Sequence, residues 1–119
     1  MIDNIRLSEK AKQQLIAIKR KTGVENWNVL CRWALNLSLL EYSEPPFEDI
    51  HLDSSIEMSW KVFTGEYSDI YHTIILQRLQ RSSHINEHDY FKLHLHRGIS
   101  YLHQKTQTID DLFSLMKKL

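Results

Sequence analysis

The sequence predicts a mainly α-helical protein, a compact multi-helix single domain over residues 1–119. Three observations predict this class. Only three glycines and two prolines interrupt the chain. Residues 28–40 are apolar apart from one thin polar stripe at steps of four, which is typical of a helix covered on most sides. Helix start signals recur along the chain, and this length suffices for a core that buries roughly two-thirds of the unfolded surface.

The first element is expected to be extended. Polar and apolar side chains alternate over residues 4–8, which predicts a short strand-like segment. Ser8 is a typical N-cap for a first helix, and Gly23 is a typical C-cap. A short strand, a helix, a glycine turn and an apolar helix, in this order, resemble the ribbon-helix-helix unit, in which two chains pair their strands.

The apolar helix at residues 28–40 organises the rest, and it carries Leu30, Trp33 and Leu37. Because a short chain has few elements to cover it, this helix is either the central core helix or a helix shared with a second subunit. A buried Trp33 would also need a partner for its indole N–H. The second alternative predicts a homo-oligomer, a dimer or a tetramer, which is the form that we expect.

The middle of the chain is predicted to be one long loop followed by two helices. Two adjacent prolines exclude a helix within residues 42–55. Ser54 and Glu57 have the spacing of a capping box, which predicts a short helix that Gly65 ends. A longer helix is expected over residues 66–81. Its predicted buried side chains are Tyr67, Ile70, Tyr71, Ile74, Ile75 and Leu79.

Two further helices are predicted towards the C-terminus. Asn86 is the expected N-cap of the first, and Thr108 opens the second. Gly98 falls in the middle of the first of these helices, where glycine costs about 1 kcal/mol relative to alanine. We therefore expect a neighbouring backbone to pass close to Gly98.

Charge is segregated along the chain although the net charge is zero. Residues 1–40 carry seven bases and three acids, residues 41–69 carry one base and eight acids, and residues 70–119 carry seven bases and four acids. Such segregation can serve an anionic partner on one face and self-association on another.

The N-terminal cations have two explanations, which the sequence leaves open. No acid lies between Glu9 and Glu25. Cations in the last turn of a helix offset the macrodipole, so the cluster could be structural. It could equally present a surface of one sign to phosphates. The residues that we predict to bind DNA are Arg6, Lys12, Lys19, Arg20 and Lys21.

A second polar group is predicted at His94, His96 and Arg97, which flank a buried stripe and could make secondary phosphate contacts. A metal site is not expected, because residues two apart diverge by about 200° around a helix. His96 and His103 share a helix face, but the sequence offers no third ligand.

Catalysis and cofactor binding are not expected either. Cys31 lies on an apolar helix without an activating base, and the chain has no glycine-rich phosphate loop. A single cysteine, no apolar run of about 18 residues and an N-terminus without a signal-peptide core predict a cytoplasmic protein without a membrane segment.

Four sequence blocks resemble a known family. They are RLSEKAKQQL (residues 6–15), WNVLCRWAL (27–35), EMSWKVFTGEY (57–67) and FKLHLHRGISYL (91–102). In this order they look like the DNA sulfur modification protein DndE family. The resemblance implies a small helical accessory protein of bacterial DNA phosphorothioation. There, a cysteine desulfurase, an ATP-pyrophosphatase-like iron–sulfur protein and an ATPase-like protein replace a non-bridging phosphate oxygen by sulfur. The resemblance brings no catalytic residues.

We therefore expect a non-enzymatic DNA-binding accessory protein that contacts phosphates through its basic N-terminal surface. Its expected partners are double-stranded DNA, intact or nicked, and other proteins of the sulfur-modification system. The alternative is a protein-interaction subunit that assembles the modification complex without binding DNA itself.

Overall fold

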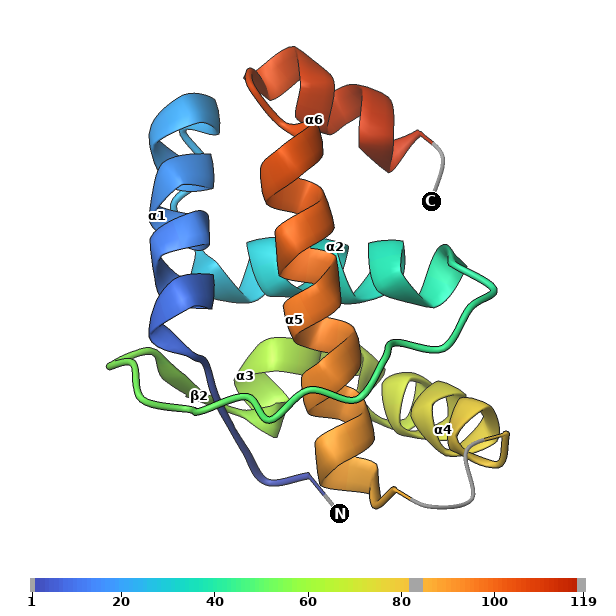
Figure 1. The fold of residues 1–119 in the computed structure, drawn as a ribbon. Helices are drawn as coiled ribbons and strands as arrows, with labels where there is room; N and C mark the ends of the chain where they lie inside the picture. Colours follow the sequence, from blue (N-terminus) through green and yellow to red (C-terminus); the bar gives the residue numbers. More distant parts are fainter. Residues whose placement is uncertain (1, 82–84, 118–119) are drawn as a thin grey trace.

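Two crossing helices form the centre of the fold. The computed structural model describes residues 2–81 and 85–117. In it, α2 (Trp27–Leu40) crosses α5 (Glu87–Lys105), and these two helices share the largest interface between elements (Figure 1). The mainly helical class predicted from the sequence is confirmed.

The crossing depends on Gly98, which lies in the middle of α5. A Cβ at this position would overlap the backbone carbonyl of Ala34 in α2 and come within 3.2 Å of its Cα. Only a residue without a side chain lets the two backbones approach this closely. The predicted close approach is confirmed, and the neighbouring backbone belongs to α2.

The apolar surface of α2 is largely covered within the chain. Leu30 and Leu37 are 0% and 7% exposed and belong to the core. Trp33 packs against the core but is only partly buried, and its indole N–H has no hydrogen-bond partner in the described ranges. The expectation of a buried indole with a partner is therefore wrong, because Trp33 lies at the edge of the core where solvent can reach it.

The other helices surround this centre. α1 (Glu9–Thr22) runs alongside α5, and α6 (Ile109–Met116) lies over the end where both helices finish (Figure 1). α3 (Trp60–Thr64) packs on α2, and α4 (Ser68–Leu79) packs near the start of α5. None of the helices in the described part of the chain is both long enough and apolar enough to span a membrane.

Local cap signals predicted the helix ends well. The side chains of Ser8, Asn86 and Thr108 each accept a hydrogen bond from a backbone N–H in the first turn of a helix. Gly23 closes α1 with a φ of 78°, a left-handed conformation that glycine adopts without strain. These predictions are confirmed. They could be made from the sequence because each cap involves residues only a few positions apart.

The N-terminal extended segment pairs within the chain. β1 (Asn4–Arg6) is antiparallel to β2 (Glu57–Ser59), with Ile5 opposite Met58. The predicted strand is therefore confirmed. Its partner strand comes from the same chain, however, which differs from the two-chain pairing of the ribbon-helix-helix unit.

The capping box predicted at Ser54 is wrong. The next helix begins only at Trp60, and its N-cap is Ser59. Ser54 and Ser55 form a bend, and the backbone on either side is hydrogen-bonded to Leu7. The N–H of Ser54 donates to the Leu7 carbonyl at 3.1 Å, and the N–H of Leu7 donates to the Ile56 carbonyl at 3.2 Å. These long-range hydrogen bonds, followed by β2 at Glu57–Ser59, take up the positions that the local signal assigned to a helix.

The helix predicted over residues 66–81 begins later and buries less than expected. A 3-10 turn, η1 (Gly65–Tyr67), precedes α4. Ile75 is buried, but Tyr67 and Ile70 are 56% and 57% exposed. α4 lies at the margin of the fold, so only a narrow face of it packs against the other helices (Figure 1).

Candidate nucleic-acid interface

The last turn of α1 gathers three of the predicted DNA-binding residues, Lys19, Arg20 and Lys21. Arg20 is exposed, and Lys19 and Lys21 are partly buried. The Lys19 Nζ lies 4.0 Å from the ring centroid of Trp27, which holds the ammonium group without removing its charge. In residues 2–81 and 85–117, none of the three has a carboxylate within ion-pair distance. In the described residues, the end of α1 therefore carries three positive charges without a carboxylate partner.

Lys12 lies on the same side of α1 as Lys19, because seven residues make nearly two full turns of an α-helix. Its Nζ donates to the Ser55 Oγ at 2.9 Å. A hydroxyl does not neutralise an ammonium, so the charge of Lys12 adds to that of the helix end.

Arg6 is placed differently. Its Nη2 lies 2.7 Å from the Glu57 Oε2, and the two residues face each other in the β1–β2 register. Its Nη1 also donates to the Ser54 carbonyl at 3.2 Å. The positive charge of Arg6 is thus compensated at the sheet, and the structure does not bring it together with the end of α1.

His94 is not at the surface. It is 1% exposed, its Nδ1 lies 2.8 Å from the Ser38 Oγ, and its Nε2 lies 3.9 Å from the Glu44 carboxylate. Burial, followed by the charges of Arg97 and Arg78, lowers the pKa of His94 to about 3. The ring is neutral at physiological pH, and it does not lie where a phosphate could contact it.

His96 and Arg97 are also engaged within the fold. The Nε2 of His96 accepts from the Ser8 N–H at 3.1 Å, so its Nδ1–H donates to the Lys92 carbonyl at 2.8 Å. Burial lowers the pKa of His96 below its ordinary value. Arg97 donates to the Ser38 Oγ at 2.9 Å and to the Ser38 carbonyl at 2.8 Å. Unlike His94, both residues line a hollow on the surface.

The two lowered histidine pKa values make stability depend on pH. An unfolded histidine takes up a proton below about pH 6.5, whereas the folded His94 ring stays neutral down to about pH 3. The unfolded state thus binds more protons in this window, so the free energy of unfolding should fall as the pH drops below 6.5, by up to about 1.4 kcal/mol per pH unit for one histidine. Urea unfolding at pH 7 and pH 5 measures the change.

The variant His94→Gln should flatten this pH dependence because its side chain takes up no proton. Loss of the hydrogen bond between His94 and Ser38 should lower its stability at pH 7. The variant His51→Gln, at an exposed position, controls for the loss of a histidine outside the core. An identical slope in wild-type protein and His94→Gln would contradict a neutral buried His94.

The described residues contain no group of three or more histidine, cysteine, aspartate or glutamate side chains that could hold a metal ion. Cys31 is 0% exposed, and burial raises its pKa to about 12. It is therefore a protonated thiol at neutral pH and a poor nucleophile.

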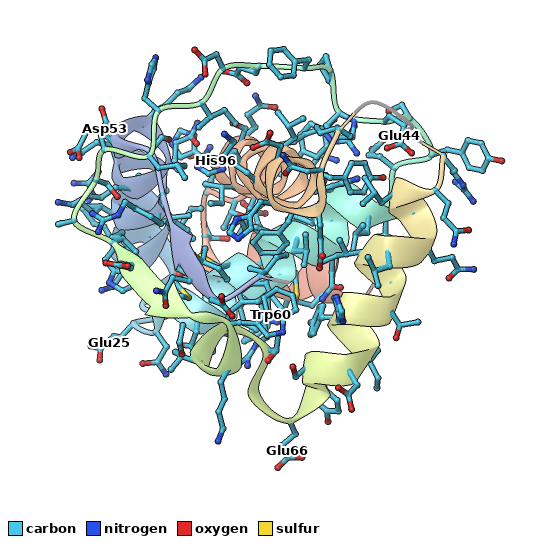
Figure 2. The ribbon with its side chains drawn as sticks, turned by 90° about the horizontal axis from the view of Figure 1, so that it is seen from below. Glu25, Glu44, Asp53, Trp60, Glu66 and His96 are labelled. Carbon is cyan, nitrogen blue, oxygen red and sulfur yellow. The ribbon has the colours of Figure 1, made fainter. Side chains whose placement is uncertain are left out.

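Sequence reasoning missed the polar cluster that holds residues 41–56, which we call the strap, against α5. The Tyr90 hydroxyl donates to the Glu44 Oε2 at 2.5 Å. Arg78 of α4 donates to the Glu41 carbonyl of the strap at 3.2 Å and to the Leu39 carbonyl of α2 at 2.7 Å. Figure 2 shows the strap passing over His96, with Glu44 and Asp53 towards its two ends. One signal was available: α2 has neither a glycine C-cap nor a basic last turn, so its final carbonyls had to find donors elsewhere.

Comparison with known proteins gives two kinds of match. A family model described as "DNA sulphur modification protein DndE" matches residues 4–110. Among solved structures, the chain is similar to DndE from Escherichia coli B7A involved in DNA phosphorothioation modification, at 20% identity and a TM-score of 0.71, covering 86% of this chain and 98% of that one.

A glycine-to-lysine mutant of DndE involved in DNA phosphorothioation is similar at 17% identity and a TM-score of 0.66, covering 87% of this chain and 99% of that one. At these identities the two structures show a shared fold. No curated protein sequence matches the chain.

Proposed function

The chain belongs to the DndE family of DNA sulphur modification proteins, and we propose that it binds duplex DNA as an accessory protein of phosphorothioation. In this role it presents DNA to the other proteins of the modification system, in the bacterial cytoplasm where that DNA lies. It carries out no chemistry itself.

The observation that carries the proposal is that Lys19, Arg20 and Lys21, at the end of α1, have no carboxylate partner in residues 2–81 and 85–117. Basic side chains without a carboxylate partner are available to neutralise DNA phosphates and to release their counterions. The strap carries Glu41, Glu48 and Asp49, all exposed, and it does not cross this end of α1 (Figure 1). The strap therefore does not stand between DNA and this end of α1.

The surroundings of the other predicted contact residues indicate how much each could contribute to DNA binding. Lys12 extends the proposed surface along α1, whereas Arg6 contributes less because Glu57 already compensates its charge. His94 is excluded as a direct contact by its burial. Sequence preference should be slight, since contacts to phosphates position a protein without reading the bases.

Binding of fluorescent DNA to the purified chain tests the proposal. Intact duplex, nicked duplex and single-stranded DNA of one sequence are titrated at several salt concentrations. The association constant for duplex should fall linearly with salt on a double-logarithmic plot, with little change between sequences. Absence of binding to every DNA form at low salt would reject the proposal.

That negative result would favour the alternative function, a protein-interaction subunit. The observation behind it is the strap, where Tyr42 and Phe47 are 88% and 79% exposed among acidic residues. Exposed aromatic side chains in an acidic segment suit a basic protein partner and would repel DNA.

We also propose that the chain forms a symmetric homo-oligomer, a dimer or a tetramer. α5 covers much of the apolar surface of α2, but several large apolar side chains elsewhere stay exposed. Tyr67 and Ile70 are more than half exposed on η1 and α4. Tyr67 lines a hollow of about 500 Å³ together with Arg32, Trp33 and Tyr71 among others, and Ile70 precedes Tyr71 in α4. Tryptophan, tyrosine and arginine are the residues that most often anchor interfaces.

Light scattering at micromolar concentration should therefore give a multiple of the mass of one chain. The variant Ile70→Glu should shift the protein towards a single chain, because it places a charge in the proposed interface. The control is Lys61→Glu, a charge change at an exposed position of α3. A single-chain mass for the wild-type protein would contradict the proposal.

A further inference from the structure

A hollow of about 300 Å³ lies between the first turn of α1, the middle of α5 and the strap. Its volume is at the lower end of the range for small-molecule sites. Lys19, Arg20 and Lys21 lie at the opposite end of α1, and Lys12 is not among the residues that line this hollow.

The walls of the hollow differ in character. Its polar lining includes Lys10, Gln14, Arg97, Ser100 and Tyr101, which come from α1 and α5. Its apolar lining comes mainly from the strap and α5 and includes Pro45, Pro46, Ile50 and Leu93. A ligand that fits must therefore combine a strongly polar group with an apolar or planar part.

Positive charge dominates the polar side. Neither Lys10 nor Arg97 has an ion pair with any carboxylate in the described ranges. Glu48 is the one carboxylate among the lining residues, and it is exposed on the strap. An anionic group in the hollow would thus meet two unpaired cations, and Glu48 would oppose it.

Arg97 is held in place before any ligand arrives. Three of its nitrogens donate to acceptors of the protein, at 2.9 Å and 2.8 Å to Ser38 and at 3.4 Å to Ser43. A guanidinium has five N–H groups, so two remain for a ligand. The neighbouring Gln14 and Ser100 are hydrogen-bonded to each other at 3.4 Å. A site with fixed polar groups loses little entropy on binding.

We propose that this hollow binds a phosphate monoester of nucleotide size. The doubly charged phosphate pairs with Arg97 and Lys10, and the Ser100 hydroxyl donates to it. The organic part of the ligand packs against the prolines of the strap. A guanidinium fork and a second cation match the charge and shape of a phosphate better than those of a singly charged carboxylate. The phosphate could belong to a free nucleotide or to the end of a DNA strand.

Titration with AMP, followed through backbone amide resonances, tests the site. Saturable shifts are expected at Lys10, Arg97 and Ser100, and adenosine, which lacks the phosphate, should produce none of them. The variant Lys10→Gln should weaken AMP binding roughly three- to tenfold, and Glu48→Gln should tighten it by a similar factor. Lys61→Gln, which removes an equally exposed lysine elsewhere, should leave binding unchanged.

The inference would be overturned by shifts that do not saturate, by shifts confined to the end of α1, or by equal effects of Lys10→Gln and Lys61→Gln. Two duplexes, with and without 5′-terminal phosphates, then identify the source. Tighter binding of the phosphorylated duplex by wild-type protein, but not by Lys10→Gln, assigns the site to a DNA end. Equal binding of both duplexes, with AMP still bound, assigns it to a free nucleotide. Failure of DNA binding at α1 would leave the AMP result unchanged.

Discussion

Replacement of Gly98 by alanine is expected to lower the free energy of unfolding by about 3 kcal/mol or more. The added methyl group would overlap the carbonyl of Ala34, and a backbone atom inside a helix cannot turn aside as a flexible side chain can. The gain of about 1 kcal/mol in helix propensity is too small to offset this overlap. α2 and α5 would have to move apart along the largest interface of the fold.

Urea unfolding of Gly98→Ala measures this effect, and Gly23→Ala is the matched control. Gly23 has open space around its missing side chain but a positive φ, so its replacement should cost only about 1–2 kcal/mol of left-handed strain. The substitution Ala34→Gly should not rescue Gly98→Ala, because the overlapping atoms belong to the backbone. A Gly98→Ala protein as stable as wild type would mean that the helices do not cross at this point.

Simultaneous replacement of Lys19, Arg20 and Lys21 by glutamine is expected to weaken duplex binding roughly tenfold to 100-fold at low salt, for all sequences alike. The three residues carry the proposed phosphate contacts, and they make no ion pair within the described residues whose loss would disturb the fold. Glutamine has a helix propensity close to that of lysine and arginine, so α1 should persist. Anisotropy titrations and far-UV circular dichroism measure the two properties.

A variant with the same loss of charge controls for non-specific electrostatics. Lys61, Arg81 and Lys92 lie on or beside α3, α4 and α5, away from the end of α1, and their joint replacement by glutamine should change duplex affinity only slightly. Equal losses in the two triple variants would mean that overall charge, and not the end of α1, determines binding.

The parts of the fold that could be predicted from the sequence are those with local causes. Ser8, Asn86 and Thr108 mark helix starts because a cap forms with a backbone group three residues away. Gly98 predicted a close helix contact because glycine lowers helix stability, and tight packing against a neighbouring backbone can offset this loss. The basic cluster was equally visible, since its three members are neighbours in the chain.

The parts that could not be predicted depend on residues far apart in the chain. The positive charge of Arg6 is compensated by the carboxylate of Glu57, which is 51 positions away in the chain. The capping box at Ser54 fails because Leu7 pairs with the same backbone. The burial of His94 follows from the path of the strap, whose Glu44 reaches Tyr90 across α5. No local pattern contains such information, because each of these contacts forms only when the chain has folded.

The salt dependence of duplex binding by wild-type protein and by the variant without Lys19, Arg20 and Lys21 tests the central proposal most directly. Each phosphate neutralised contributes about −0.9 to the slope of log K against log salt. Loss of three contacts per chain should make the slope shallower by about 2.7 for each chain that contacts the DNA. A variant with unchanged slope and affinity would contradict the proposal that DNA binds at the end of α1.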